Sequence, residues 1–328
     1  MRYFGLFLTL MLLWLGAFSA EKYDLVVAQD GSGDYKTIQQ AVDACRIFPD
    51  KPFTIHVKNG VYHEKIAILE GNTFLTIIGE SVDKTVISWD DYFNKINRGR
   101  NSTFYTYTLK VEAGDFRMEN ITVENTAGPI GQALALYVEG DRCVFVNCRF
   151  LGNQDTVYAA GRIGRQYFYS CYIEGTTDFI FGEATALFEK CTIHAKVNSF
   201  LTAASTAQGK AFGYVFKECK ITAAEGVTKV FLGRPWRGYA KVAFLNCEMG
   251  SFIVPEGWDN WSNEENKKTV TFLEYKNTGA GADRSKRVTW SHEMTQKEAS
   301  KYTKEKIFAP WQWELAEDAN WYQLVKKS

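Results

Sequence analysis

One short pattern recurs five times in the middle of the chain and constrains the fold more than any other feature. Each copy places a phenylalanine three positions before a cysteine and another apolar residue two positions after it. The copies recur at a period of roughly 20 to 30 residues, which is typical of proteins built from stacked repeats. They are Phe145-x-x-Cys148, Phe168-x-x-Cys171, Phe188-x-x-Cys191, Phe216-x-x-Cys219 and Phe244-x-x-Cys247.

The residues between the copies indicate the type of repeat. From Thr103 to Gly250, short runs rich in Val, Ile, Phe, Tyr and Thr are broken by Gly, Asn or Asp, without helical periodicity. Such units fit the coils of a parallel β-helix, in which each coil hydrogen-bonds only to its neighbours. The cysteine and the apolar residue after it would point inward, and a bend before the cysteine would turn the phenylalanine inward too. We therefore predict an all-β protein with a parallel β-helix.

The cysteines favour an internal ladder over disulfides. Five of the seven occupy the same repeat position, so they would stack as small buried side chains. The odd number of cysteines and their apolar neighbours favour free thiols. No Cys-x-x-Cys pair occurs, which argues against a zinc site. We expect no metal ion and no cofactor.

The N-terminal segment, residues 1–20, is typical of a secretory signal peptide. Arg2 precedes an apolar run from Phe4 to Leu15, and small residues follow up to Ala20. The apolar run is shorter than the roughly 20 residues that a membrane span needs. We expect residues 1–20 to be removed and residues 21–328 to form a single β-helix catalytic domain. The protein would be secreted, either to the extracellular space or, in a Gram-negative bacterium, to the periplasm or cell surface.

The segments on either side of the repeats have their own patterns. Residues 37–45 have helical spacing with one apolar face, which suits a short helix that caps the open N-terminal end of the solenoid. From about Trp258 the chain is rich in Trp, Lys and Glu, with a short helical patch near residues 295–302. We expect this tail to pack along the solenoid or over its end. Three early strands are predicted at residues 23–28, 54–57 and 61–68.

The charge balance limits the partners. The chain has 38 basic and 38 acidic side chains, so its formal net charge is zero. That balance argues against a nucleic-acid-binding protein that works through bulk charge. We expect no nucleic-acid partner, no membrane partner and a monomer, because a solenoid of this type needs no second copy.

Two aspartates occupy similar positions in consecutive repeats. Asp155 precedes Cys171, and Asp178 precedes Cys191 at a similar separation along the chain. Equivalent positions on adjacent coils are roughly 4.8 Å apart. Two carboxylates that close repel each other, so one would stay ionised while the other holds its proton. This arrangement suits a nucleophile beside a general acid/base.

We expect other polar residues to fall on the same face, if the loops between coils vary by a few residues. Arg234 precedes Cys247 at the same separation as Asp178 precedes its cysteine, and it could hold one carboxylate ionised through a forked hydrogen bond. Gln132 and Gln154 are neutral amide donors suited to an oxyanion. A structural role remains an alternative, in which these residues form coil corners and an ion pair. The absence of Gly-x-Ser-x-Gly and of metal-type histidine spacing argues against a serine hydrolase or a zinc enzyme.

Five segments of the chain resemble the signature segments of pectin methylesterases and occur in that family's order. The only departure is Val157, where leucine is usual, and the resemblance extends over essentially the whole chain after the signal peptide. The segments are Gly60-Val61-Tyr62-His63-Glu64, Gln132-Ala133-Leu134-Ala135-Leu136, Gln154-Asp155-Thr156-Val157-Tyr158, Asp178-Phe179-Ile180-Phe181-Gly182 and Leu232-Gly233-Arg234-Pro235-Trp236.

The resemblance implies a right-handed parallel β-helix and a role for each polar residue. Asp178 resembles the nucleophile that attacks the C6 methyl ester of a galacturonate. Asp155 resembles the acid that protonates the departing methanol and then the base that activates water. Gln132 and Gln154 match the residues that stabilise the oxyanion. Arg234 matches the arginine that orients the nucleophile and contacts substrate.

The resemblance also implies the substrate, which is methylesterified homogalacturonan (pectin). Trp236 matches a sugar-binding aromatic residue, and Thr103 resembles a further substrate contact. Tyr158, Phe181 and Trp258 are candidate cleft walls, although packing roles are equally consistent with their sequence positions. Three other functions remain open: a β-helical glycoside hydrolase of pectin, a polysaccharide lyase, and a carbohydrate-binding solenoid without catalysis.

Overall fold

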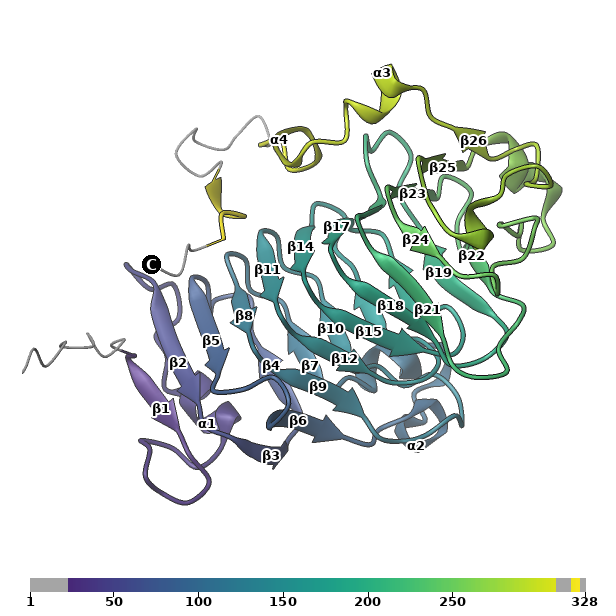
Figure 1. Ribbon diagram of the computed structural model, residues 1–328. Coiled ribbons are helices and arrows are strands. Elements are labelled where there is room, and N and C mark those ends of the chain that lie inside the picture. The colour runs from purple at the N-terminus through teal and green to yellow at the C-terminus, as the bar shows by residue number, and fades with distance from the viewer. Residues whose placement is uncertain (1–22, 311–319, 325–328) are drawn as a thin grey trace, which may run out of the picture.

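The strands wind into stacked coils that form three parallel sheets, as the computed structural model shows (Figure 1). The structure describes residues 23–310 and 320–324. Within these residues the sheets contain eleven, eight and seven strands. The predicted parallel β-helix is therefore confirmed. The predicted signal peptide, residues 1–20, lies outside the described residues.

Each sheet collects equivalent strands from successive coils, and the eleven-stranded sheet extends further than the other two. The eleven-stranded sheet contains β1 (Leu25–Val27), β2 (Phe53–Val57), β5 (Leu75–Gly79), β8 (Arg117–Glu119), β11 (Cys143–Val146), β14 (Arg165–Tyr169), β17 (Thr185–Glu189), β20 (Tyr214–Lys217), β23 (Lys241–Leu245), β25 (Thr271–Tyr275) and β26 (His292–Glu293). The eight-stranded sheet contains β3 (Gly60–His63), β6 (Thr85–Trp89), β9 (Thr122–Asn125), β12 (Arg149–Leu151), β15 (Tyr172–Gly175), β18 (Thr192–Ala195), β21 (Lys220–Ala223) and β24 (Glu248–Met249). The seven-stranded sheet contains β4 (Ile66–Ile68), β7 (Leu109–Val111), β10 (Leu136–Val138), β13 (Val157–Ala159), β16 (Ile180–Gly182), β19 (Phe200–Ala204) and β22 (Phe231–Pro235).

The bend expected between the repeat phenylalanine and cysteine is a single left-handed residue. In the coil of β11 and β12 it is Asn147, with φ of 50°. Because this residue turns the chain, Phe145, Cys148 and Phe150 are all buried. Successive coils use the same corner, with φ between 46° and 56°, at Asn120, Asn147, Ser170, Lys190, Glu218, Asn246 and Lys276.

The repeat side chains stack along the solenoid interior. Successive phenylalanine rings, from Phe145 to Phe244, have centroids 4.5 to 4.7 Å apart and interplanar angles of 9° to 14°. The five repeat cysteines are buried free thiols, and both other cysteines are free as well, as predicted. Burial of these stacked apolar side chains is the main favourable term that holds the coils together.

The N-terminal end is closed by α1 (Ile38–Asp43), which confirms the capping helix. Its buried residues Ile38, Ala41 and Val42 pack against the first coils. One early prediction was wrong, because residues 61–68 are two strands, β3 and β4, in different sheets. The corner between them contains Glu64, whose carboxylate accepts hydrogen bonds from the backbone N–H groups of Ile38 and Gln39. The corner therefore also holds the start of the capping helix.

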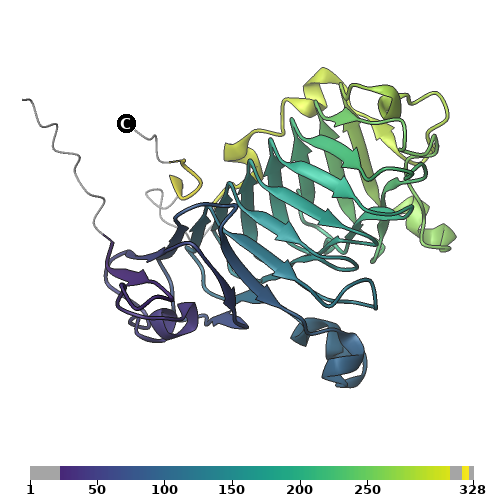
Figure 2. The ribbon, with the colours of Figure 1, turned by 60° about the horizontal axis from the view of Figure 1, so that its bottom comes forward.

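The coils extend beyond the predicted range of 103–250 in both directions, and an insertion interrupts them. The insertion contains α2 (Phe93–Ile96) and the 3-10 helix η1 (Gly99–Tyr105), and it projects from the coils in Figure 2. Thr103 therefore lies in this insertion and not in a coil. The insertion is tied to the solenoid by a backbone hydrogen bond of 3.0 Å from Phe93 N–H to the Gln132 carbonyl.

The C-terminal segment packs along the solenoid, as predicted. It contains two more 3-10 helices, η2 (Glu264–Lys268) and η3 (Ala280–Ala282), and the short helices α3 (Gln296–Ala299) and α4 (Lys304–Ile307). Met294, Ile307 and Phe308 form an apolar cluster with outward-facing residues of the eleven-stranded sheet, such as Tyr167 and Leu187. In Figure 1, α3 and α4 lie above the strand ends of this sheet. None of the helices in the described ranges is long and apolar enough to cross a membrane.

The thiol ladder yields a stability prediction. We expect Cys191→Ala to lower the free energy of unfolding by about 1 kcal/mol, because it removes one buried sulfur and leaves a small void. Specific activity per folded molecule should not change, because Cys191 faces the interior. Urea unfolding and an activity assay on the folded protein would measure both quantities.

Thr192→Ala is the matched control, since Thr192 is the next residue along and is only half-buried. That change should alter stability by less than about 0.5 kcal/mol. Loss of specific activity in a folded Cys191→Ala protein would contradict the assignment of this cysteine to the scaffold.

Candidate active site

The two aspartates lie on consecutive coils at the corner that leads into the seven-stranded sheet. Asp155 precedes β13, and Asp178 precedes β16. The Asp155 N–H donates to the Thr177 carbonyl at 3.1 Å, and the Asp178 N–H donates to the Phe200 carbonyl at 2.9 Å. Both aspartates have a left-handed backbone, with φ of 65° and 51°. Because aspartate is among the few non-glycine residues that tolerate this conformation, the backbone of the corner favours aspartate at both positions.

The two carboxyl groups are buried and have different surroundings. Asp155 is 9% exposed and Asp178 is 6% exposed. Burial, followed by the charge of Asp178, raises the pKa of Asp155 well above its usual value. Burial also raises the pKa of Asp178, but the hydrogen bonds and charge of Arg234 oppose that effect. These surroundings favour the protonated form at Asp155 and, through Arg234, the ionised form at Asp178.

Arg234 makes the forked contact that the sequence predicted. Its Nε donates to Asp178 Oδ1 at 3.0 Å, and its Nη2 donates to Oδ2 at 2.6 Å. Arg234 comes from β22, two strands away from β16 in the sheet. Both oxygens of Asp178 are thus fixed by one planar cation, which favours the ionised carboxylate and defines its orientation.

The two glutamines lie beside the aspartates. Gln132 and Gln154 pair with each other as a parallel bridge on neighbouring coils, and Gln154 directly precedes Asp155. Their side-chain amides form no hydrogen bond with any residue in the described part of the chain, and neither does the Asp155 carboxyl. Both glutamine side chains are half-buried. The amide N–H groups are therefore available to donate hydrogen bonds to an oxygen atom of a molecule bound beside the two carboxyl groups.

An aromatic surface follows the outer face of the seven-stranded sheet next to the aspartates. Tyr158 stacks on Phe181 with a centroid distance of 4.7 Å, and Phe181 contacts Trp236 edge-on at 5.7 Å. Tyr137 and Phe104 contact Tyr158 at 4.9 and 5.0 Å. Aromatic rings on an open sheet face are typical of sugar binding, because they present flat apolar surfaces to sugar rings.

Two of the predicted substrate contacts lie in unexpected surroundings. Thr103 is 8% exposed, but its neighbour Phe104 contacts the aromatic surface, so η1 borders the site. Trp258 lines the cavity described below, but most of its side chain packs in the core. It is 1% exposed, stacks on Phe272 at 4.3 Å and donates its indole N–H to Glu274, so it belongs to the core at the C-terminal end.

Four aromatic residues near the site were not predicted. Tyr137 and Phe104 complete the aromatic surface, and Phe200 and Trp261 flank the guanidinium group of Arg234. Tyr137 faces outward at the same register as Tyr158 and Phe181, so the pairing of β10, β13 and β16 could have indicated it. Trp261 lies outside the repeats, and no sequence signal identifies its contact.

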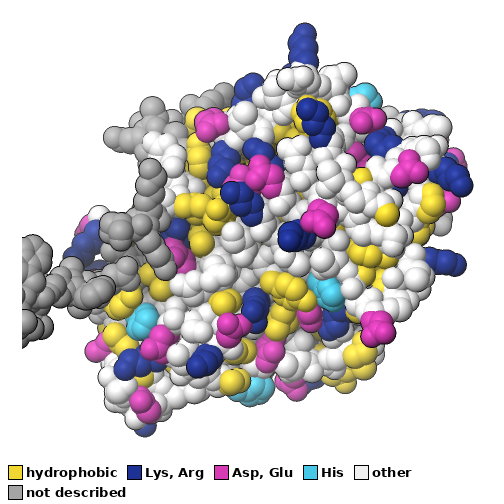
Figure 3. All heavy atoms as spheres, viewed as in Figure 1, with side chains coloured by type: hydrophobic (Ala, Val, Ile, Leu, Met, Phe, Trp, Pro, Cys, Tyr) yellow, Lys and Arg dark blue, Asp and Glu magenta, His cyan; other side chains and the backbone are white. Residues whose placement is uncertain are grey.

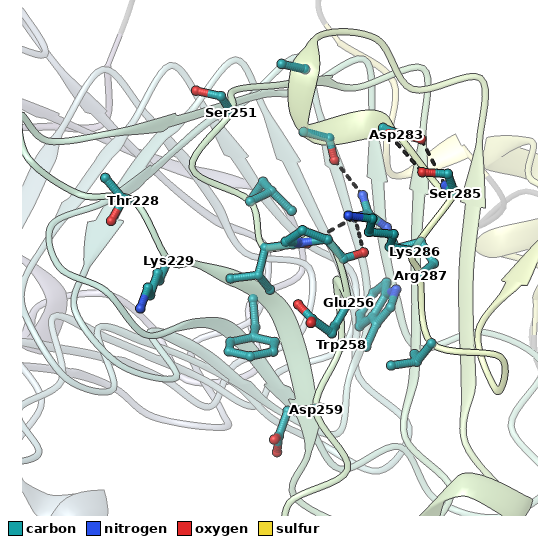
Figure 4. Close-up of a pocket in the computed structure, with 17 residues that line it drawn as sticks. Thr228, Lys229, Ser251, Glu256, Trp258, Asp259, Asp283, Ser285, Lys286 and Arg287 are labelled. Carbon is teal, nitrogen blue, oxygen red and sulfur yellow. Dashed lines mark hydrogen bonds between the residues drawn. The ribbon is translucent and has the colours of Figure 1, made fainter.

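A cavity of about 820 Å³ lies beyond Arg234, toward the C-terminal end of the solenoid. Phe231 and Asp259 line it, and Phe231 stacks on Phe200 at 5.1 Å. Figure 4 shows Thr228 and Lys229 on one side of this cavity and Asp283, Ser285 and Lys286 on the other. The cavity therefore lies on the coils that follow those of the two aspartates. Among the described residues, no group of three or more His, Cys, Asp or Glu side chains is placed to hold a metal ion.

The fold and site define a hydrolase-type arrangement on a parallel β-helix, and comparisons with known proteins identify the family. A family model described as Pectinesterase matches residues 24–310. The chain therefore belongs to the pectinesterase family and is a carboxylic ester hydrolase.

Individual relatives agree with this assignment. The chain is 40% identical over 292 residues to Pectinesterase 31 of Arabidopsis thaliana, covering 87% of this chain and 92% of that protein. It spans 40% to 58% of the length of several pectinesterase/pectinesterase inhibitor relatives from the same plant. A carrot pectin methylesterase structure is similar with a TM-score of 0.84 and 32% identity, covering 92% of this chain and 97% of that one. A pectin methylesterase in complex with a hexasaccharide has a TM-score of 0.79 and 30% identity, covering 90% and 100%.

The forked ion pair yields a kinetic prediction. We expect Arg234→Lys to lower kcat by roughly 10- to 100-fold, because a lysine cannot make two parallel charge-assisted hydrogen bonds. Arg234 holds the pKa of Asp178 down against burial, so the weaker contact should raise that pKa. The acid limb of the kcat/KM profile should then move to higher pH, since a smaller fraction of Asp178 is ionised at any given pH.

Arg149→Lys provides the control. Arg149 forms an exposed ion pair with Asp83 at 2.6 Å and lies on the eight-stranded sheet. Its replacement should leave kcat and the pH profile unaltered. Unchanged kinetics in Arg234→Lys would instead mean that this arginine is only structural.

Proposed function

We propose that the protein hydrolyses the C6 methyl esters of galacturonate units in pectin, with Asp178 as nucleophile and Asp155 as acid/base. The observation that carries the proposal is the asymmetry of the two buried carboxyl groups on consecutive coils. Asp178 is paired with Arg234, whereas Asp155 has no hydrogen-bond partner among the described residues and a pKa raised further above its usual value. One ionised and one protonated carboxyl group are what nucleophilic ester cleavage needs.

In the first half of the reaction, an Asp178 oxygen attacks the ester carbonyl carbon and forms a tetrahedral intermediate. The amides of Gln132 and Gln154 donate to the resulting oxyanion. As the intermediate collapses, the bond to the methoxy group breaks and Asp155 gives its proton to that oxygen. Methanol leaves, and the galacturonyl group remains attached to Asp178 as a mixed anhydride.

In the second half, Asp155 is ionised and takes a proton from water. The water oxygen attacks the same carbonyl carbon, and the amides again stabilise the oxyanion. Collapse breaks the bond to Asp178 and releases the free galacturonate carboxyl group. Asp155 is protonated again and Asp178 returns to the ionised state beside Arg234, so one water is consumed and one methanol is produced.

The substrate assignment is supported by the aromatic surface and by the family. Trp236 and Tyr158 present partly exposed rings next to the aspartates, where a sugar chain can lie along the sheet, and the buried Phe181 packs against both rings. Relatives named as pectinesterases and the hexasaccharide complex agree with a polymeric pectin substrate. Thr103 remains a proposed minor contact. Membership of the pectinesterase family favours ester hydrolysis over glycoside cleavage, elimination or simple binding.

We further propose that the protein is secreted and acts as a monomer. The predicted signal peptide supports export to the compartment where pectin is found. On the face shown in Figure 3, basic and acidic side chains are interspersed, which is consistent with the expectation that nucleic acid is not a partner. A solenoid with a capping helix and a covering C-terminal segment needs no second chain to close its ends.

The assignment of the nucleophile gives the most direct variant test. Asp178→Ala should abolish methanol release, with a loss of at least about 10⁴-fold, because no other group attacks the ester. Asp178→Asn should be similarly inactive, although it keeps the shape of the side chain. Thermal unfolding of both variants should show an intact solenoid. Methanol release near the wild-type rate from either variant would rule out this role for Asp178.

The reaction itself is tested by assaying three products from highly methylated pectin. The purified protein should release methanol without new reducing ends and without unsaturated products. Reducing ends without methanol would indicate a glycoside hydrolase, and unsaturated ends would indicate a lyase. Absence of all three products would favour a carbohydrate-binding solenoid.

A further inference from the structure

The guanidinium group of Arg234 lies between two aromatic rings. Its central carbon is 4.0 Å from the ring centroid of Phe200 and 3.8 Å from that of Trp261. Its edge donates two hydrogen bonds to Asp178. Two rings at this distance from a planar cation restrict its movement, and the forked contact restricts it further. The two rings and the carboxylate therefore fix the arginine together.

The two rings come from distant parts of the chain. Phe200 begins β19 on the coil directly after Asp178, and it stacks on Phe231. Its ring is thus a fixed part of the coils. Trp261 lies outside the coils, between the buried Trp258 and η2, and is 36% exposed. The C-terminal segment therefore supplies one of the two rings that contact Arg234.

The backbone around Trp261 is held in a turn that directs this residue. Trp261 and Ser262 both have a left-handed backbone, with φ of 59° and 52°. The Asp259 carboxylate accepts a hydrogen bond of 2.7 Å from the Trp261 N–H, and the Asn260 side-chain oxygen accepts one of 3.1 Å from the Ser262 N–H. Trp258, three positions earlier, anchors the segment in the core. The placement of the Trp261 ring is therefore supported from both the core and the turn.

We propose that Trp261 is a positioning residue for ester hydrolysis, which closes an aromatic clamp over Arg234 and keeps its forked ion pair with Asp178 formed during turnover. This inference rests on the proposed function of Asp178. Trp261 acts through Arg234 and does not contact the reacting atoms. The clamp is needed because Arg234 also faces the substrate side, where a passing polymer carboxylate could compete with Asp178 for the guanidinium group.

The clamp should affect the pH dependence of the reaction. The charged groups that face Asp178 are Asp155, Arg234 and Asp259. Only Arg234 lowers the pKa of Asp178, while burial and the charge of Asp259 raise it. A mobile Arg234 would offset less of the increase that burial causes in the pKa of Asp178, so that pKa would rise. Activity would then be lost first on the acid side of the profile.

The test compares Trp261→Leu with Trp261→Phe on methylated pectin. We expect Trp261→Leu to lower kcat roughly tenfold and to move the acid limb of the kcat profile to higher pH, because one face of the cation is lost. Trp261→Phe keeps an aromatic face and should restore most of kcat and the original acid limb. An increase in KM alone, with kcat and the acid limb unchanged, would overturn the proposal and make Trp261 a substrate contact only.

Tyr105→Leu is the matched control. The Tyr105 ring is 41% exposed and stacks on Arg98 at 4.3 Å, but that arginine does not contact Asp178. Its loss should leave kcat and the acid limb unchanged. Equal effects of the Tyr105 and Trp261 changes would show that removal of any exposed arginine-stacking ring is sufficient, which would also overturn the clamp.

A double variant separates the clamp from other roles of Trp261. In an Arg234→Lys background, Trp261→Leu should lower kcat less than about twofold further, because the planar cation that the ring holds is already absent. A full tenfold additional loss would contradict action through Arg234. If the unaltered protein releases no methanol, both the proposed function and the clamp fail. If the unaltered protein releases methanol and Trp261→Leu leaves kcat and the acid limb unchanged, the clamp is contradicted but the proposed function is not.

Discussion

The stacking of coils at one strand spacing is the constraint on which the whole structure depends. It places equivalent side chains directly above one another, so the interior becomes a ladder of phenylalanines and cysteines. The same spacing brings Asp155 and Asp178 together at a corner, where two like charges would repel. The protein resolves that conflict by pairing Asp178 with Arg234 and by burying Asp155 without a cation of its own. The geometry that stabilises the core thus also creates the chemical asymmetry of the site.

Residues with a left-handed backbone shape both the core and the candidate active site. Left-handed residues such as Asn147 turn the chain between the eleven-stranded and eight-stranded sheets and direct phenylalanine and cysteine inward. Asp155 and Asp178 are left-handed residues at the following corner. The C-terminal segment then adds a part that no coil supplies. Trp258 enters the core, and Trp261 covers Arg234, so the closure of the solenoid end and the order of the site are linked through one short stretch.

Sequence patterns predicted the features that repeat or that form ordered motifs. The coils and the thiol ladder could be predicted from the repeated cysteine pattern, and the proximity of Asp155, Asp178 and Arg234 could be predicted because each lies at a similar distance before a repeat cysteine. The corner between β3 and β4 could not, because it contains Glu64 and Lys65 and no glycine or asparagine that marks a turn. The roles of Trp258 and Trp261 could not be separated either. They lie close together in a segment without periodicity, and only tertiary packing places one in the core and the other on Arg234.

The most direct test of this account is a pH titration of the two carboxyl groups by carbon NMR on protein with labelled aspartate. Signals would be assigned by comparison with Asp155→Asn and Asp178→Asn proteins. The account predicts that Asp178 ionises first and that Asp155 keeps its proton to distinctly higher pH. If both groups ionised together over one pH range, or Asp155 ionised first, the division of roles between nucleophile and acid would be contradicted.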